Sequence, residues 1–236
     1  MSKKTTKVLV FDVETSGLLP KNKEEAKIEE YPYILQISFV VFDTNGWKIT
    51  KTANTYINVP QSVEITKKIT ELTGITREMC DKGIQIQRAL REFAKEYMEC
   101  DIIVAHNINF DRQMIKIEIE RNKEFLEPNT RILFDRDFEK QNNKFNYCTM
   151  YGGKNLCKIE MTDSKGEKYF KCPKLVELYE HLFEMVPGNL HNSLIDTFIC
   201  LRCFVKMRFK FDLSLRGFPD IPFTKSKKEI KSENNV

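Results

Sequence analysis

The sequence has no apolar run long enough to cross a membrane, and its first residues, MSKKTTK, lack the apolar stretch of a secretion signal. It also lacks internal repeats and a low-complexity core segment. The seven cysteines are odd in number and unevenly spaced, which argues against a disulfide framework. We therefore expect an intracellular protein, cytoplasmic or nuclear and not secreted, with free thiols and no membrane partner.

A strong excess of charge of either sign is missing as well. The net charge is +4 and the pI is about 8.5, a slight preference for polyanionic partners that falls far short of a histone-like sequence. Hydrophobic residues make up 41% of the 236 residues, so the chain can bury one core without disulfides or structural metals. Length and composition together indicate one globular domain with room for insertions.

Apolar runs and periodicity indicate an α/β fold. Short apolar runs predict β-strands at residues 7–13, 34–43, 47–59, 101–107 and 131–134. Helical periodicity predicts helices at residues 61–71, 86–99, 110–121, 173–183 and 192–208. The pair Asn45-Gly46 predicts a two-residue hairpin turn after the second strand. This order indicates a mixed central β-sheet, with three antiparallel strands and then parallel strands, flanked by helices.

We expect a single domain over residues 1–215. Within it, residues 135–172 have weak periodicity and three cysteines, so we interpret them as a peripheral insertion or an irregular connection. Residues 216–236 form a polar tail that ends in TKSKKEIKSENNV (224–236), a segment without aromatic residues. Such a composition cannot bury a core, and we expect the tail to be disordered.

Two acidic residues, Asp12 and Glu14, close the apolar first strand in the sequence VFDVETSG (10–17). Side chains alternate along a strand, so both carboxylates project from the same face. One explanation is a strand end that frays into solvent, where two acids are harmless. The following Thr15-Ser16-Gly17 favours a ligand site instead, because small residues and a glycine let the backbone approach a ligand closely.

Two further acidic residues stand at buried elements. Asp111, in AHNINFD (105–111), closes a buried strand and opens a helix, where an N-cap is the alternative role. Asp196, in LHNSLIDTFICLRCF (190–204), lies at helical spacing among apolar neighbours, which disfavours a plain solvated face, although one polar stripe is an alternative. His191 precedes Asp196 by five residues, and its alternative is a purely structural role.

These four acids need cations if they converge in the fold. Carboxylate oxygens without a cysteine or histidine cluster favour Mg²⁺ or Mn²⁺ over zinc. Two such ions about 4 Å apart form the clamp used for phosphodiester displacement, and an imidazole can take the proton from the attacking water near neutral pH. The C-x-x-C of Cys200 and Cys203 has no second pair on its predicted helix, so core packing explains it better than zinc.

The three motifs resemble those of the DEDDh group of 3′–5′ exonucleases, in the DnaQ-like, RNase H-like superfamily. FDVETSGL (11–18) is similar to the first motif, AHNINFD to the second, and LHNSLIDT, with its histidine-x4-aspartate spacing, to the third. LTGIT (72–76) and PKLVELYEHLF (173–183) are similar to a loop and a helix of these enzymes. Order and spacing fit over residues 7–208.

The resemblance implies an RNase H-like fold and a metal-dependent exonuclease that releases nucleoside monophosphates from nucleic-acid 3′ ends. The ligands it implies for two Mg²⁺ or Mn²⁺ ions are Asp12, Glu14, Asp111 and Asp196. It makes His191 the general base. The residues it places against the terminal nucleotide are Thr15, Leu18, Gly74 and Ile75.

DNA is the favoured substrate, as a single-stranded or frayed 3′ end, with a polymerase or a replication or repair protein as partner. The alternatives are an exoribonuclease that trims RNA, and a catalytically silent nucleic-acid-binding or polymerase-accessory proofreading module. The sequence departs from the family at Ser193, where alanine is usual, and in the long stretch 135–172. We interpret His106 and Asn107 as residues that brace the second motif.

Overall fold

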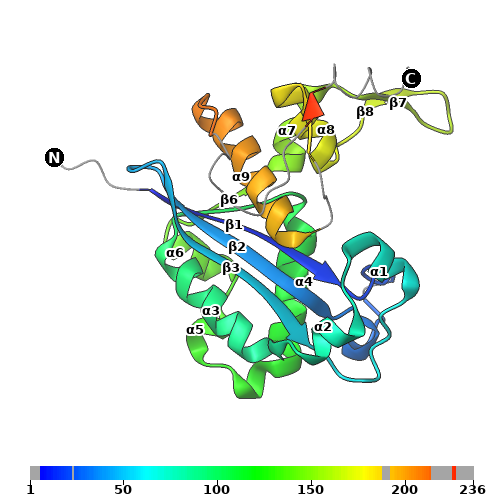
Figure 1. The fold of residues 1–236 in the computed structure, drawn as a ribbon, viewed down its shortest axis with the longest axis vertical. Helices are drawn as coiled ribbons and strands as arrows, with labels where there is room; N and C mark the ends of the chain where they lie inside the picture. The colour runs from blue at the N-terminus through cyan, green and yellow to red at the C-terminus, as the bar shows by residue number, and fades with distance from the viewer. Residues whose placement is uncertain (1–5, 23, 188–191, 214–224, 227–236) are drawn as a thin grey trace.

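The computed structural model describes residues 6–22, 24–187, 192–213 and 225–226. Its centre is a six-stranded sheet in the order β4-β3-β2-β1-β5-β6 (Figure 1). The strands are β1 (Lys7–Thr15), β2 (Ile34–Asp43), β3 (Lys48–Asn58), β4 (Ile84–Gln85), β5 (Ile102–Ala105) and β6 (Phe145–Cys148). β1, β2 and β3 pair antiparallel, whereas β5 runs parallel to β1 and to β6. The predicted mixed sheet is confirmed.

Helices cover both faces of this sheet. The main ones are α3 (Ile86–Glu99), α4 (Ile108–Asn122), α7 (Thr149–Cys157), α8 (Leu175–Phe183) and α9 (Ser193–Phe209). Shorter ones are α1 (Lys67–Thr73), α2 (Arg77–Asp81), α5 (Pro128–Arg131), α6 (Arg136–Gln141) and the 3-10 turns η1 (Ile28–Glu30) and η2 (Lys123–Phe125). α3 and α4 lie on one face, and α9 crosses the other, with α7 and α8 packed against it (Figure 1).

β1 is apolar without alternation because both of its faces are buried. Phe11 belongs to the core cluster that α3 and α4 complete, and its ring centroid lies 5.1 Å from that of Phe93. Val8 and Val10 belong to the opposite cluster, with Phe204 of α9. Since alternate residues share a face, the side chain of Asp12 continues the row of Val8 and Val10 and points toward α9.

The sequence prediction was wrong at residues 131–134, where the structure has no strand. Arg131 ends α5, and Phe134 adopts a positive φ of 59°, which an extended strand does not permit. Leu133 and Phe134 are nevertheless buried, and the Phe134 N–H donates to the Tyr97 hydroxyl over 3.2 Å. A short apolar run reports burial, and it cannot by itself distinguish a buried turn from a strand.

The sixth strand comes instead from the stretch 135–172. β6 pairs with β5 from Ile102–Phe145 to Ala105–Cys148 and forms an edge of the central sheet. The residues of β6 are exposed or half-buried and do not alternate, so the sequence lacks the periodicity of a strand there. The remainder of the stretch carries α7 and a small hairpin of β7 (Glu160–Thr162) and β8 (Lys168–Phe170). The interpretation as a peripheral insertion therefore does not apply to β6.

The turn between β2 and β3 is longer than predicted. Asp43 pairs with Lys48, so four residues form the loop, and neither Asn45 nor Gly46 has the positive φ that a type I′ turn requires. The left-handed residue is Trp47, with φ 48°. Its ring packs against Phe42 and against aromatic residues of the α9 end, and this contact outweighs the local turn preference.

The remaining differences lie at element ends and in the tail. The helix predicted at 61–71 begins only at Lys67, because the Thr66 side chain caps it by accepting from the Ile69 N–H. Of the predicted disordered tail, only 225–226 lie within the described residues, as β10, paired with β9 (Met185–Val186). Among the helices that the structure describes, none combines the length and apolar character needed to span a membrane.

Candidate active site

Carboxylates from the first and third motifs meet at the C-terminal end of β1. Asp12, Glu14 and Asp196 each offer an oxygen, and these oxygens all lie within 4.8 Å of one another. We call these three residues the carboxylate cluster. Asp12 and Glu14 come from one face of β1, and Asp196 comes from the first turn of α9. The convergence expected from the sequence is thus present for residues that are far apart in the chain.

The beginning of α9 is held against β1 by short-range contacts. The Asn192 side chain caps the helix by accepting from the N–H groups of Leu194 and Ile195 over 3.2 and 3.4 Å. The Ser193 hydroxyl donates to the main-chain oxygen of Asp12 over 3.0 Å. Asp196 lies in this first turn, where the helix dipole favours a negative charge.

Asp111 of the second motif lies beside the carboxylate cluster and is not one of its three members. α4 starts after Asn107, whose left-handed backbone (φ 68°) is one that asparagine tolerates better than most residues. Asp111 is only 3% exposed, and its Oδ1 accepts the Val13 N–H over 3.2 Å. The main chain of β1 therefore positions this carboxylate next to Asp12 and Glu14.

The pKa values of these acids reflect burial and mutual repulsion. Burial, and then the charges of Asp111, Asp196 and Glu14, raise the pKa of Asp12 well above its ordinary value. Burial and the neighbouring acids raise the pKa of Glu14 to about 8. Burial raises the pKa of Asp111 to about 7, although the Val13 N–H opposes that shift. A divalent cation bound among them would offset both effects.

The donor set fits a hard divalent metal ion. The carboxylate cluster supplies only oxygen ligands, which Mg²⁺ and Mn²⁺ prefer. Within the described residues, no cysteine or histidine belongs to a group of this kind. Cys200 and Cys203 are free thiols buried in the packing of α9, so their C-x-x-C spacing serves the core.

The histidine of the third motif, His191, lies outside the described residues, and its role as general base stays a prediction. His106 of the second motif is described and is bound on both ring nitrogens. Its Nε2 donates to the Pro173 carbonyl over 3.1 Å, so Nδ1 accepts from the Thr149 hydroxyl over 3.0 Å. Burial lowers the pKa of His106 to about 4, and a neutral, fixed imidazole suits a positioning role.

Thr149 is the member of this arrangement that the sequence did not single out. It is fully buried and begins α7, directly after β6. Its only signal in the sequence is the segment YCTM (147–150), in which a hydroxyl side chain follows the last two residues of a short strand. Through His106, this threonine joins the β6–α7 corner to the second motif.

The residues expected to contact the terminal nucleotide differ in exposure. Leu18 is 86% exposed, and Gly74 is the left-handed cap of α1, with open space where a Cβ would lie. The Thr15 hydroxyl donates to the Gly17 carbonyl over 2.7 Å and so shapes its own loop. Ile75 is only 1% exposed, and its side chain cannot stack on a base from the core. Leu72, in the same segment, is 53% exposed and is the apolar side chain available there.

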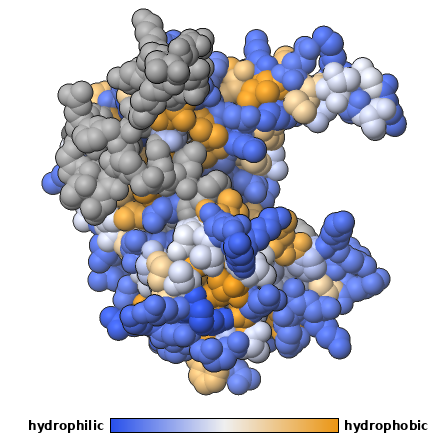
Figure 2. All heavy atoms as spheres, turned by 45° about the vertical axis from the view of Figure 1, so that its right-hand side comes forward, coloured by the Kyte–Doolittle hydropathy of each residue, from blue (hydrophilic) through white to orange (hydrophobic). Residues whose placement is uncertain are grey.

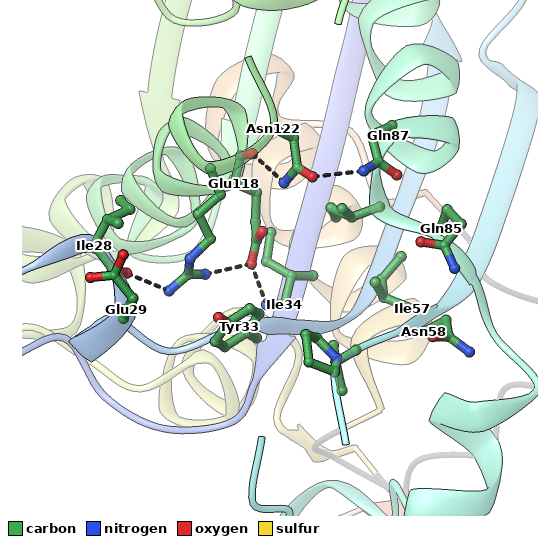
Figure 3. A pocket seen from close by; sticks show the side chains of 14 residues that line it. Ile28, Glu29, Tyr33, Ile34, Ile57, Asn58, Gln85, Gln87, Glu118 and Asn122 are labelled. Atoms are coloured by element: carbon green, nitrogen blue, oxygen red, sulfur yellow. Dashed lines mark hydrogen bonds and ion pairs between the residues drawn. The ribbon is translucent and has the colours of Figure 1, made fainter. Parts of the chain in front are cut away.

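The loop after the first motif is locked to the start of β2. The Ser16 N–H donates to the Tyr33 carbonyl, and the Tyr33 N–H donates to the Ser16 hydroxyl, each over 2.9 Å. Behind this loop, Arg121 of α4 donates to Glu118 over 2.8 Å and to the Ile28 carbonyl over 2.9 Å (Figure 3). These contacts line a cavity of about 330 Å³ that none of the four acids borders. The residues that line this cavity hold the loop after the first motif in place, and the cavity is separate from the carboxylate cluster.

Comparison with known proteins agrees with this geometry. A family model described as Exonuclease, RNase_T, matches residues 9–204. Over 113 residues, or 48% of the chain, the sequence is 36% identical to a DNA polymerase III PolC-type of Thermotoga maritima. It is 34% identical, over the same share of the chain, to the 3′-5′ exonuclease DinG of Bacillus subtilis. The matches span only 7% and 11% of the length of those two proteins.

Solved structures share the fold. The nuclease domain of 3′hExo, a DEDDh family member bound to rAMP, superposes with a TM-score of 0.59 at 15% identity, over 95% of this chain and 100% of that one. E. coli Exonuclease I in complex with a dA16 oligonucleotide superposes with a TM-score of 0.55 at 16% identity, over 86% of this chain and 41% of that one. On the extent of the family match, the chain belongs to the RNase_T exonuclease family, the DnaQ-like group that its three motifs resemble.

Proposed function

We propose that the protein is a metal-dependent 3′–5′ exonuclease that hydrolyses phosphodiester bonds at nucleic-acid 3′ ends and releases nucleoside monophosphates. The observation that carries this proposal is the carboxylate cluster, in which Asp12, Glu14 and Asp196 place oxygens within 4.8 Å of one another. Asp111 adds a fourth carboxylate beside these half-buried acids, and it is itself buried. Buried acids at such proximity are costly unless a cation compensates them.

The residues of the chain divide the chemistry between them. Asp12, Glu14 and Asp196 would hold the metal, with Asp111 completing a site for two Mg²⁺ or Mn²⁺ ions. When bound, these ions supply positive charge at the scissile phosphate and make a water molecule more acidic. The His191 imidazole takes the proton from the attacking water, since imidazoles exchange protons near neutral pH.

The segments that hold the substrate end in this proposal are the loop after β1 and the C-terminal end of α1. We propose that Leu18 and Leu72, which are exposed apolar side chains, contact the face of the terminal base. Stacking of this kind tolerates any base, because every base has a π-face. Thr15 and Gly74 contribute the shape of their loops, through the Thr15–Gly17 hydrogen bond and the open left-handed position of Gly74.

DNA is the substrate we favour. The sequence relatives at 34–36% identity include DNA polymerase III PolC-type proteins, whereas the neighbour bound to rAMP is 15% identical. The same relatives suggest a polymerase or another replication or repair protein as a partner. An exoribonuclease remains the second candidate, and recognition of the 2′-hydroxyl decides between the two.

One assay tests the proposal. The full chain is incubated with matched single- and double-stranded DNA and RNA, each labelled at the 3′ or the 5′ end, in the presence of Mg²⁺ or Mn²⁺. We expect the 3′ label to leave first as a mononucleotide, and the 5′-labelled strand to shorten stepwise. Asp12→Asn keeps the size of the side chain, and should reduce the rate by a factor of about 10² or more, because the metal supplies several kcal/mol.

Glu64→Gln is the matched control, since Glu64 is an exposed acid outside the site and its loss of charge should leave the rate unchanged. Intact oligonucleotides after long incubation with Mn²⁺ would instead favour a silent binding module. Full activity of the Asp12→Asn protein would refute the assignment of this residue.

A further inference from the structure

A small hairpin stands apart from the fold and has no role in the chemistry described above. It runs from Ile159 to Lys171, contains β7 and β8, and is closed at its base by the Lys171 N–H, which donates to the Ile159 carbonyl over 3.0 Å. We call it the β7–β8 hairpin. Every residue of its two strands is exposed. In both overall views it projects clear of the body of the molecule (Figure 1, Figure 2).

Both faces of the β7–β8 hairpin carry large apolar side chains. Met161 pairs with Tyr169 across the two strands, so their side chains share one face, and they are 43% and 48% exposed. Phe170, 39% exposed, lies on the opposite face. A hairpin with three-residue strands is marginal in isolation and gains little by leaving such side chains in water. These rings therefore suit a ligand that they can contact.

The charge of the segment points to an anion. Between residues 158 and 174 the sequence has five lysines and three acidic residues. Lys168 pairs with Glu160 over 2.7 Å, and Lys171 pairs with Glu177 over 2.5 Å. Of these five lysines, Lys158, Lys165 and Lys174 form no ion pair with another residue that the structure describes. Exposed rings interleaved with such lysines match the stacking and phosphate contacts of single-stranded nucleic acid.

The base of the hairpin is fixed next to the second motif. Pro173, two residues after the hairpin ends, receives the hydrogen bond from His106 Nε2. His106 immediately precedes Asn107, after which α4 begins and brings in Asp111. In Figure 1 the hairpin projects toward the same side as the C-terminal end of β1, where Asp12 and Glu14 lie. A single-stranded nucleic acid whose 3′ end enters the carboxylate cluster can thus continue toward the hairpin.

We propose that the β7–β8 hairpin binds the single-stranded part of the substrate upstream of its 3′-terminal nucleotide. Tyr169, Phe170 and Met161 stack on bases, and Lys158, Lys165 and Lys174 contact phosphates. This inference rests on the proposed function, which identifies the ligand as a nucleic-acid strand. It assigns long substrates a second contact that a mononucleotide ester lacks.

Two measurements on the 236-residue chain test the hairpin separately from the active site. The first is the dissociation constant for a long fluorescent oligodeoxythymidylate without metal, by fluorescence anisotropy. The second is Mn²⁺-dependent hydrolysis of thymidine 5′-monophosphate 4-nitrophenyl ester, which is too short to reach the hairpin. For Tyr169→Ala/Phe170→Ala we expect the dissociation constant to rise about tenfold or more, with ester hydrolysis unchanged.

Matched variants define the cause. Tyr169→Phe keeps the ring and should bind as the wild type does, and Phe125→Ala removes a ring that is 66% exposed elsewhere and should also change nothing. Wild-type affinity in the Tyr169→Ala/Phe170→Ala protein would overturn the hairpin proposal and leave a protein partner as the occupant, even if the enzyme is active. A wild type that binds through the hairpin and hydrolyses neither substrate would refute the proposed function alone.

Discussion

The Ser193 hydroxyl donates a hydrogen bond of 3.0 Å to the main-chain oxygen of Asp12. This bond joins the first turn of α9 to the end of β1, and so fixes the distance between Asp196 and the two acids of the strand. Ser193 is fully buried, and because protein interiors are close-packed, a larger side chain at this position would displace its neighbours. The departure from the family's usual alanine thus has a physical role, because it adds one hydrogen bond to a contact that alanine makes by size alone.

Two substitutions of Ser193 should distinguish the effect of its side-chain size from the effect of its hydrogen bond on stability and activity. Ser193→Ala removes only the bond, and we expect a loss of about 1 kcal/mol in the free energy of unfolding with activity retained. Ser193→Leu adds volume between α9 and β1, and should cost about 1–3 kcal/mol and most of the activity, because Asp196 is displaced. Urea denaturation and the oligonucleotide assay measure the two effects. A fully active Ser193→Leu protein would contradict this account of the contact.

The raised pKa values predict that the metal-free protein loses stability as the pH rises. Burial and the neighbouring acids raise the pKa of Glu14 from 4.5 to about 8, and burial raises that of Asp111 from 3.8 to about 7. A folded-state pKa above the unfolded value means that the stability is present at low pH and is lost as the pH rises through about 7 to 8. With EDTA, the melting temperature should therefore be lower at alkaline than at mildly acidic pH.

Mn²⁺ should restore most of this loss at alkaline pH, because the cation neutralises the ionised acids. The Glu14→Gln protein should show a shallower pH dependence in EDTA, and the exposed-acid variant Glu64→Gln should follow the wild type. A melting temperature in EDTA that is flat between the two pH values would argue against repulsion within the carboxylate cluster.

The lowered pKa of His106 predicts the opposite effect at acidic pH: the free energy of unfolding should fall as the pH falls. Burial lowers its pKa from 6.5 to about 4, so the unfolded chain binds a proton that the folded protein excludes. The folded protein therefore loses up to about 3 kcal/mol as the pH falls from about 6.5 to about 4. Urea denaturation of the wild type and of His106→Gln at several pH values gives the free energy of unfolding of each protein. The difference between their pH dependences measures the contribution of His106. Parallel curves for the two proteins would show that His106 carries no such shift.

Arg121 predicts a large structural effect at a distance from the acids. Its guanidinium lies 3.8 Å above the Tyr33 ring and donates to Glu118 and to carbonyls of the segment before β2, as Figure 3 shows in part. Arg121→Met leaves the Glu118 carboxylate buried without its cation, and should cost about 3–5 kcal/mol in urea denaturation. Adding Glu118→Gln to this variant should recover part of the loss. Equal stability of the single and double variants would show that the charge of Glu118 is not the cause.

The parts of the fold with strong periodicity could be predicted from the sequence. β1 and β2 are buried on both faces, so their apolar runs are continuous, and the buried residues of α3 recur at helical spacing. The pairing of Asp12 with Glu14 on one face follows directly from the alternation of a strand. The meeting with Asp196 required the family pattern, because no local property of the sequence brings α9 to β1.

The rest depended on tertiary contacts that a single sequence does not display. Phe134 lies in a turn and is buried in the core. In the sequence, its apolar run therefore looks the same as that of a buried strand. β6 is an edge strand with half-exposed residues, and it shows no clear alternation. Ile75 and Leu72 lie three residues apart, yet only the fold determines that the first is buried and the second exposed.

Crystals of the full chain soaked in MnCl₂, measured at the manganese absorption edge, test the central claim most directly. We predict anomalous difference peaks for two ions among Asp12, Glu14, Asp111 and Asp196, with the peaks lost in the Asp12→Asn protein. Manganese bound elsewhere, or carboxylates that stay empty at saturating Mn²⁺, would contradict the account.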